Sequence, residues 1–219
     1  MVSVVIPAFN EADRIGDTVR AAKSLPGIDE IVVVDDCSND GTADEAAKNG
    51  ARVLRLPYNQ GKGQALNHGI REARGDILVF LDGDLGATAK EAAKLIQPIL
   101  RDEADLTVGC FPKARKKGGF GLVKGLARYG IARYTGLNIQ SPISGQRAMR
   151  RRVAEKLLPL ASGYGVEVYM TIMAARHGFR ILEVPVNMTH RETGRDLKGF
   201  LHRGRQFRDI FLTLVRLKT

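Results

Sequence analysis

The stretch DILVFLDGDLGATAKE, residues 76–91, places five apolar residues directly before two closely spaced carboxylates. A run that is apolar throughout is typical of a strand in a parallel sheet with both faces covered, so residues 77–81 are predicted to form such a strand. A helical pattern follows over 88–101. Asp82 and Asp84 would lie at the mouth of a buried strand, where folding alone gains little from them, so their position indicates a ligand.

The same alternation of strand and helix extends to both sides of this stretch. Short β-branched runs occupy 2–6, 31–35, 52–56 and 105–109, and helix-like segments occupy 11–25, 42–49 and 61–73. Buried strands separated by helices predict an α/β fold, a Rossmann-like, doubly wound and mostly parallel sheet with helices on both faces. In that architecture ligands bind at the carboxyl ends of the strands.

Polar motifs follow the predicted strands at those ends. They are PAFNE (7–11), DDCSNDGT (35–42), NQGKGQ (59–64) and DGD (82–84). Because the carboxyl ends of parallel strands meet at one edge of a sheet, the four motifs are predicted to form one binding site.

The bulk composition is that of an ordinary globular protein. The chain has 219 residues, of which 44% are hydrophobic and 26% charged, and it holds only two cysteines. These figures argue against disorder and exclude a disulfide framework. No stretch approaches the roughly 18 apolar residues that span a bilayer. We expect one soluble, cytoplasmic domain over 1–219, with a ligand-binding half (1–110) and a second half (111–219).

Charge divides unevenly between these halves. Residues 1–110 carry 12 Lys+Arg against 18 Asp+Glu, a net charge of −6, and residues 111–219 carry 22 against 6, a net charge of +16. Such asymmetry favours an anionic partner for the second half: nucleic acid, a lipid surface or a phosphorylated small molecule. A solvated basic face is the alternative. Only 6% of the residues are aromatic and Trp is absent, which argues against nucleic acid.

The second half has a looser pattern. A basic, glycine-rich segment (111–125) predicts a lid centred on 113–121. Helices are expected over 126–136 and 163–179, and a strand over 180–188. The tail, 197–217, has apolar residues at spacings of three and four and basic residues between them, so it is predicted to be an amphipathic helix. That helix would either lie on a membrane or pack on the sheet.

Several side chains are candidates for chemistry. Asp82 and Asp84 lie two apart, so both can point to one side and bind Mg²⁺ or Mn²⁺; turn or capping aspartates are the alternative. Asp36 could accept hydrogen bonds from a base or ribose. Lys62 could offer its cation to a diphosphate, or could be a surface lysine at a helix start. Glu167 could be a base, an orienting carboxylate or a favourable charge in the first turn of a helix.

Taken together, VVIPAFNE (4–11), IVVVDDCSNDGT (31–42), NQGKGQALNHGI (59–70) and GDILVFLDGDL (75–85) resemble the family-2 type of glycosyltransferases with the GT-A fold. The resemblance implies that the chain binds a nucleoside-diphosphate-sugar. It implies a nucleotide pocket lined by Pro7, Ala8, Asn10, Glu11, Asp36, Lys62, Asp82 and Gly83. It also implies that Asp82 and Asp84 bind the metal that bridges the diphosphate, with Asp84 and Glu167 as the catalytic residues.

The second half resembles two branches of that family. SGQRAMRR (144–151) is similar to the Ser-Gly-aromatic-Arg segment of dolichyl-phosphate mannose synthases, which use a lipid phosphate. GYGVEV (163–168) and THR (189–191) are similar to glucosyl-3-phosphoglycerate synthases, a retaining group. In that group a histidine corresponding to His190 joins the metal. The resemblance implies an acceptor site at Ser144, Gly145, Arg147, Arg191 and Arg195.

We therefore expect a metal-dependent glycosyltransferase that moves a sugar to an anionic acceptor, either a polyprenyl phosphate or a small phosphorylated or carboxylated molecule. The alternatives are a nucleotidyltransferase and a non-catalytic nucleotide-sugar binding protein. Against the former, no glycine-rich, basic loop directly follows the first strand. Peripheral contact with the inner face of the membrane, homodimerisation, the sugar, the base and the stereochemical outcome stay open.

Overall fold

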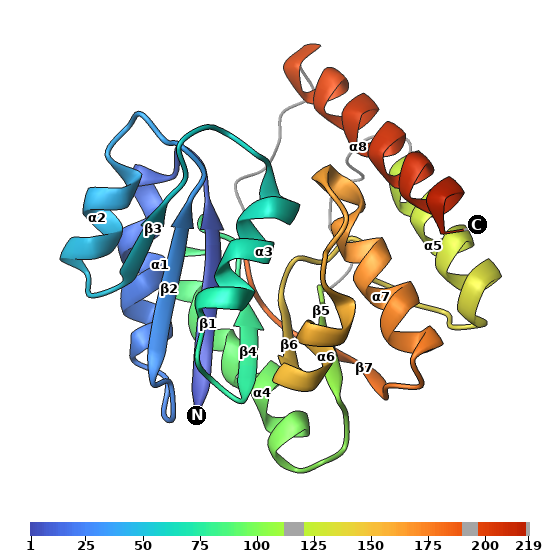
Figure 1. Cartoon of the computed structure of the whole chain (residues 1–219), viewed down its shortest axis with the longest axis horizontal. Coiled ribbons are helices and arrows are strands. Elements are labelled where there is room, and N and C mark those ends of the chain that lie inside the picture. The colour runs from blue at the N-terminus through green and yellow to red at the C-terminus, as the bar shows by residue number, and fades with distance from the viewer. Residues whose placement is uncertain (112–120, 190–196, 218–219) are drawn as a thin grey trace.

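The computed structural model describes residues 1–111, 121–189 and 197–217, and the side chains of 197–202 are not part of that description (Figure 1). The predicted lid, 113–121, lies outside the described residues except for Gly121, and so do His190, Arg191 and Arg195.

A seven-stranded sheet forms the centre of the molecule, in the order β3-β2-β1-β4-β6-β5-β7. The strands are β1 (Val2–Ala8), β2 (Glu30–Asp35), β3 (Arg52–Arg55), β4 (Ile77–Phe80), β5 (Leu106–Cys110), β6 (Arg147–Arg150) and β7 (Ile181–Pro185). Only β6 runs antiparallel to its neighbours, so the predicted α/β, mostly parallel sheet is confirmed.

The helices follow the predicted alternation. They are α1 (Ala12–Lys23), α2 (Thr42–Lys48), α3 (Lys62–Glu72), α4 (Ala92–Leu100), α5 (Leu122–Thr135), α6 (Arg151–Leu157), α7 (Val166–Arg176) and α8 (Leu197–Arg216), with the short 3₁₀ helices η1 (Gly86–Glu91) and η2 (Gly163–Gly165). The predicted helix over 126–136 begins earlier, at Leu122. Gly121 adopts a left-handed conformation before it, and Val123 packs with the core of the second half.

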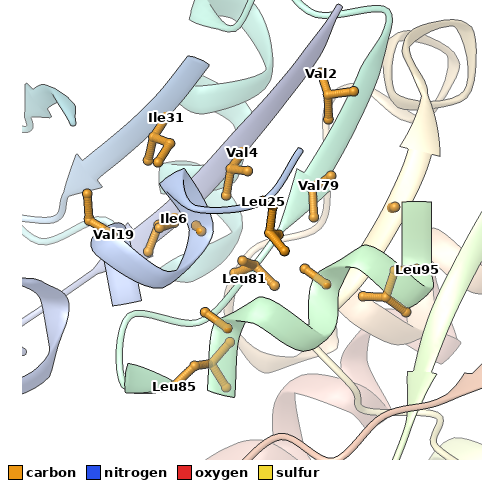
Figure 2. Packing of buried hydrophobic residues seen from close by; sticks show 14 of the residues in the cluster. Val2, Val4, Ile6, Val19, Leu25, Ile31, Val79, Leu81, Leu85 and Leu95 are labelled. Atoms are coloured by element: carbon orange, nitrogen blue, oxygen red, sulfur yellow. The ribbon is translucent and has the colours of Figure 1, made fainter. Parts of the chain in front are cut away.

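Successive side chains of β1 point to opposite faces of the sheet and contribute to two separate apolar cores. Val4 and Ile6 point to the face covered by α1, α2 and α4, as Figure 2 shows for the residues of that cluster. Val5 points to the other face and packs with α3, α6 and α7. Because every central strand contributes side chains to both faces, the sheet is buried on both sides, as the apolar runs predicted.

A third apolar cluster lies outside these layers. Its buried members are Ala127 and Ile131 of α5, Ile139 after that helix, Val168 and Ile172 of α7, and Ile210 and Leu214 of α8. Gly130 lets α8 approach closely, since a Cβ there would lie 2.4 Å from Leu214 Cδ2. The tail helix therefore packs on α5 and α7 rather than on the sheet.

The strand β6 was not predicted. Its sequence, RAMR, is too short and too basic to read as a buried strand. It pairs with β4 so that Arg147 lies opposite Phe80, and its antiparallel direction brings the segment before it to the carboxyl end of β4. Residues 144–146 thereby come next to the Asp82–Asp84 turn.

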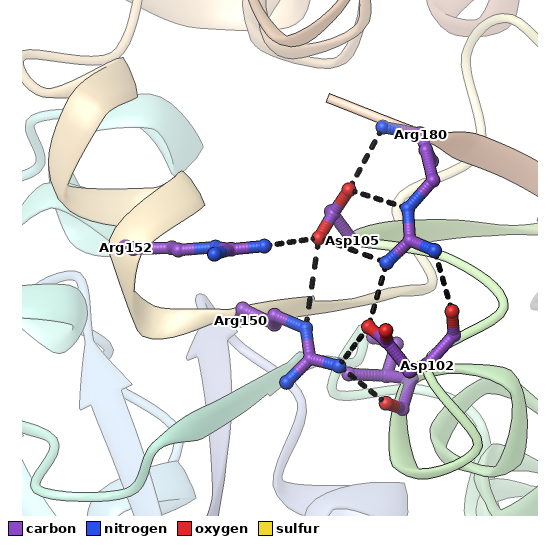
Figure 3. Close-up of polar contacts among 6 residues, drawn as sticks. Asp102, Asp105, Arg150, Arg152 and Arg180 are labelled. Carbon is purple, nitrogen blue, oxygen red and sulfur yellow. Dashed lines mark hydrogen bonds and ion pairs between the residues drawn. The ribbon is translucent and has the colours of Figure 1, made fainter. Parts of the chain in front are cut away.

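The opposite end of β5 is held by an ion-pair network (Figure 3). Asp105 is 4% exposed, and its carboxylate lies 3.0 Å from Arg180 Nε and 2.6 Å from Arg152 Nη2. Asp102 binds Arg150 and Arg180 at 2.8 and 2.7 Å. These arginines come from three different segments, so the network joins β5, β6 and β7. Part of the basic excess of the second half is thus structural.

Asp105→Asn is expected to lower the free energy of unfolding by roughly 2 kcal/mol at neutral pH, because the buried carboxylate that pairs with Arg152 and Arg180 loses its charge. Hydrogen bonds from Arg180, outweighing burial, hold the pKa of Asp105 well below its ordinary value. Its stabilising contribution is then present above the unfolded pKa of about 4 and is lost as the pH falls below it.

Urea denaturation of both proteins at neutral pH and at about pH 3 checks this expectation, and the difference between them should shrink at the lower pH. Asp44→Asn, which breaks an exposed pair with Arg55, is the control and should change little. A difference of equal size at both pH values would contradict the assignment.

Candidate functional site

A cleft of about 650 Å³ opens at the carboxyl ends of β1, β2 and β4. Helices α5, α7 and α8 and the turn η2 complete its walls. The lining residues are Pro7, Ala8, Phe9, Glu11, Asp36, Asn59, Gly61, Lys62, Ala65, Asp82, Gly83, Asp84, Val123, Ile143, Gly163, Tyr164, Glu167, Arg205, Gln206 and Ile210. The cleft thus combines the edge predicted from the first half with residues of the second.

The predicted nucleotide residues gather at one side of the cleft. Asp36 accepts hydrogen bonds from the backbone N–H groups of Gln60 and Gly61, both at 2.7 Å, so its carboxylate also fixes the loop before α3. Asn10 does not line the cleft. It adopts φ 56°, and its Oδ1 accepts a hydrogen bond from the Asn39 N–H, so it joins the first two polar motifs.

The centre of the site is a cation held by two carboxylates. Lys62 Nζ lies 2.7 Å from Asp82 Oδ1 and 2.8 Å from Glu167 Oε1. Burial acts to lower the pKa of Lys62, but the two carboxylates outweigh it and raise that pKa above its ordinary value. Lys62 is therefore charged, and the first turns of α3 and α7 are joined to the end of β4.

The unpredicted strand supplies a further contact. Gln146 Nε2 donates to Asp82 Oδ2 at 2.8 Å, so both oxygens of Asp82 are engaged. A glycine precedes Gln146, and a Cβ at Gly145 would lie 2.4 Å from Lys62 Nζ and 2.8 Å from Asp82 Oδ1, so a side chain there would displace both groups. Ser144 is buried, and its hydroxyl lies 3.4 Å from Gln146 Oε1.

Hydrogen bonds from α1 hold the turn that carries Asp84. Thr18 Oγ1 donates to the Gly83 carbonyl at 2.9 Å, and Arg14 Nη1 donates to the Asp84 carbonyl at 3.2 Å. These contacts use the backbone of the turn, and the side chain of Asp84 lines the cleft. The structure therefore brings Asp82, Asp84, Lys62 and Glu167 together, as a site at the strand edge requires.

The prediction that Arg147 belongs to the acceptor site needs a correction. It has no exposed surface, its Nε donates to the Ser144 carbonyl at 3.0 Å, and its Nη1 donates to Thr171 Oγ1 at 3.0 Å. Burial lowers its pKa to about 10, against the opposing effect of Glu167 and Glu183. A side chain so enclosed cannot contact an acceptor. Arg147 instead ties the Ser144–Gln146 segment to α7.

The donor set suits a hard divalent cation that also binds a phosphate. Asp82 and Asp84 offer carboxylate oxygens at the cleft, and Asp82 already binds the ammonium of Lys62. Within residues 1–111, 121–189 and 203–217, no group of three His, Cys, Asp or Glu could hold a metal by itself. Mg²⁺ sites commonly combine one or two carboxylates with substrate phosphates and water, so the two aspartates fit that pattern.

Sequence reasoning missed several residues of the cleft. Phe9 is 48% exposed and offers an aromatic face. Tyr164, Arg205 and Gln206 belong to segments that carry no polar motif of the strand-end type. The signal that could have found Tyr164 is its flanking pair of glycines, which implies a close approach of another element.

Gly145→Ala is expected to weaken binding of a nucleoside diphosphate with Mn²⁺ by about tenfold or more, because the added methyl group displaces Lys62 and Asp82. Calorimetric titration measures this change. Gly125→Ala is the matched control, since that helical glycine has open space around its Cβ position. Unchanged affinity in Gly145→Ala would show that the Lys62–Asp82 geometry does not matter for binding.

Comparisons with known proteins identify the family of this chain. The model of glycosyl transferase family 2 matches residues 3–158. An uncharacterised protein of Methanocaldococcus jannaschii is 33% identical over 87% of this chain and 82% of its own. A dolichol-phosphate mannosyltransferase of Pyrococcus furiosus is 32% identical over 90% of this chain and 59% of its own.

Solved structures give the same result. Glucosyl-3-phosphoglycerate synthase from Mycobacterium tuberculosis, in complex with Mn²⁺, UDP-glucose and phosphoglyceric acid, superposes with a TM-score of 0.81 at 28% identity. The match covers 99% of this chain and 79% of that one. The chain spans about three fifths of the length of the named relatives found by sequence. The chain belongs to glycosyl transferase family 2.

Proposed function

We propose that this chain is a metal-dependent glycosyltransferase that moves a sugar from a nucleoside-diphosphate-sugar to an anionic acceptor, with residues 1–219 acting as one GT-A domain. The observation that carries the proposal is the Lys62 ammonium between Asp82 and Glu167, in a cleft at the carboxyl ends of the strands. Structures of relatives with Mn²⁺ and UDP-glucose, or with Mg²⁺ and UDP, support it.

The donor would lie along the edge formed by the first half. Pro7, Ala8 and Glu11 would surround the nucleoside, and Asp36 would accept hydrogen bonds from it. Asn10 would support this pocket through its hydrogen bond from the Asn39 N–H. Lys62 would bind the diphosphate. Asp82 and Asp84 would hold Mg²⁺ or Mn²⁺ together with His190, and that cation would stabilise the charge of the departing diphosphate.

Glu167 would act through Lys62. Its carboxylate is 5% exposed and lies 2.8 Å from the ammonium, so it orients the cation that faces the diphosphate. If the acceptor reacts through a phosphate, the nucleophile is already ionised and no strong general base is required. For an acceptor hydroxyl, the leaving phosphate or Glu167 would take the proton.

Two kinds of relative support an anionic acceptor. The names of several denote a lipid phosphate, such as the dolichol-phosphate and undecaprenyl-phosphate transferases, and another is solved with phosphoglyceric acid. Both kinds of acceptor carry a phosphate. Ser144, Gly145, Arg191 and Arg195 remain our candidates for the acceptor side.

The outer face of α8 favours peripheral contact with a membrane. Phe207, Phe211 and Val215 follow each other at spacings of four and are 41%, 51% and 50% exposed. Arg208 and Arg216 are exposed beside them. An apolar row flanked by arginines matches helices that lie in the interface of anionic bilayers, here at the inner, cytoplasmic face. Within the described residues, no helix is long and apolar enough to cross a membrane.

Asp84→Ala is expected to lower the rate of sugar transfer by about a hundredfold or more while the melting temperature stays near that of the wild type, because Asp84 would bind the metal and not the core. EDTA should abolish transfer by the unmodified protein, and added Mn²⁺ should restore it. Full activity in EDTA would contradict a metal-dependent mechanism. The assay follows release of the nucleoside diphosphate.

Liposome flotation with anionic lipids at low salt tests the membrane contact. The wild-type protein should float with the vesicles, and a Phe207→Ser/Phe211→Ser variant should remain in the soluble fraction, because it loses most of the exposed apolar row. Leu100→Ser, which removes an exposed apolar side chain at the end of α4, is the control and should still float. Wild-type protein left in the soluble fraction would rule out the membrane proposal.

A further inference from the structure

The second half is strongly basic, yet few of its described cations reach the cleft. Arg147 is enclosed beneath the site, and Arg150, Arg152 and Arg180 bind Asp102 and Asp105 at the far end of β5. Among the described residues, the cations that line the cleft are Lys62 and Arg205. Lys62 pairs with two carboxylates, and the proposed function assigns its cation to the diphosphate of the donor. Among the described residues of the cleft, Arg205 is therefore the cation that is left for an acceptor anion.

Arg205 lies on α8, which is anchored at the edge of the cleft by the turn η2. The Tyr164 N–H donates to Asp209 Oδ2 at 3.3 Å. Both neighbours of Tyr164 must be glycine. A Cβ at Gly163 would lie 2.3 Å from Asp209 Oδ2, and one at Gly165 would lie 2.0 Å from Thr213 Oγ1. The two glycines therefore let η2 pack closely against α8, and on that helix Arg205 and Gln206 line the cleft.

Tyr164 lines the cleft together with Lys62, Glu167 and Arg205. Burial and then Asp209 raise the pKa of Tyr164, while Arg205 and Lys62 oppose them. Arg205 in turn is exposed, and no carboxylate of the described residues lies within ion-pair distance of its guanidinium.

We propose that Arg205 binds the anionic group of the acceptor, a phosphate or a carboxylate, on the wall of the cleft that α8 forms. The inference rests on the proposed function and makes α8 part of the active site. A guanidinium offers two parallel N–H donors to either anion, which a lysine cannot do. The nucleotide and metal would use the strand edge, and the acceptor would enter beside α8 and Tyr164.

The test compares wild-type protein with Arg205→Gln, Arg205→Lys and, as the matched removal of one exposed arginine charge outside the cleft, Arg133→Gln on α5. Each protein is loaded with Mn²⁺ and with UDP or GDP, whichever the wild type binds more tightly. It is then titrated with phosphoglyceric acid and, separately, with undecaprenyl phosphate in detergent micelles. Saturation by the first probe identifies a soluble acceptor, and saturation by the second a lipid.

Arg205→Gln should weaken binding of the acceptor by about 10- to 100-fold, and Arg205→Lys by less, since it keeps the charge but loses the fork. Affinity for the nucleoside diphosphate should change by no more than about twofold in either variant, and Arg133→Gln should match the wild type. Melting temperatures near that of the wild type show that each variant is folded.

Equal acceptor affinity in Arg205→Gln and wild type would overturn the inference, and so would binding of neither acceptor by the wild type. A loss confined to the nucleoside diphosphate would assign Arg205 to the donor and overturn it as well. Failure of the wild type to bind any nucleoside diphosphate would contradict the proposed function itself, and the inference with it.

Discussion

The ammonium of Lys62, held at 2.7 Å from Asp82 and 2.8 Å from Glu167, is the contact on which the rest of the site depends. Burying a lysine is costly unless carboxylates compensate, and here two do so from separate elements. The contact needs the end of β4, the start of α3 and the start of α7 at one point. Removing Lys62 would leave two carboxylates facing each other, so the same charge that would meet a diphosphate also holds these three elements together.

Other elements of the fold support the contact between Lys62, Asp82 and Glu167. The antiparallel strand β6 delivers Gly145 and Gln146 against Asp82, and buried Arg147 ties the same segment to α7. On the far side, the Gly-Tyr-Gly turn seats α8 so that its residues complete the cleft. Basic residues of the second half therefore do several different things. Some hold the sheet together at Asp105, Arg147 supports the site from within, and Arg205 lines the cleft.

The first half of the chain could be predicted because its pattern is local. Apolar runs specify strands buried on both faces, and the chain order of strands and helices then brings the polar motifs to one edge. That logic placed Asp36, Lys62, Asp82 and Asp84 at the cleft. It could not find β6, since RAMR has neither the length nor the apolar run of a central strand and is ordered by its neighbours on both sides.

Arg147 and Arg205 show why local sequence patterns cannot predict every site residue. Arg147 was predicted at the site and is buried, whereas Arg205 was not predicted there and lines the cleft. A motif next to the site suggested that Arg147 would face the acceptor, but antiparallel pairing and Thr171 turn it inward. Arg205 sits in a helix whose periodicity indicates only an amphipathic face. Its position at the cleft follows from contacts between η2 and α8, residues far apart in the chain, and no local pattern encodes them.

The central claim is that this edge of the sheet binds a nucleoside diphosphate through a divalent cation. The most direct measurement is the melting temperature of the wild-type protein with each nucleoside diphosphate, with and without Mn²⁺. A ligand that binds only the folded state raises that temperature, by about 5 °C or more near saturation for a chain of this size. The claim predicts a rise for UDP or GDP with Mn²⁺ and a much smaller one without it. Equal rises with and without Mn²⁺, or no rise with any nucleoside diphosphate, would contradict it.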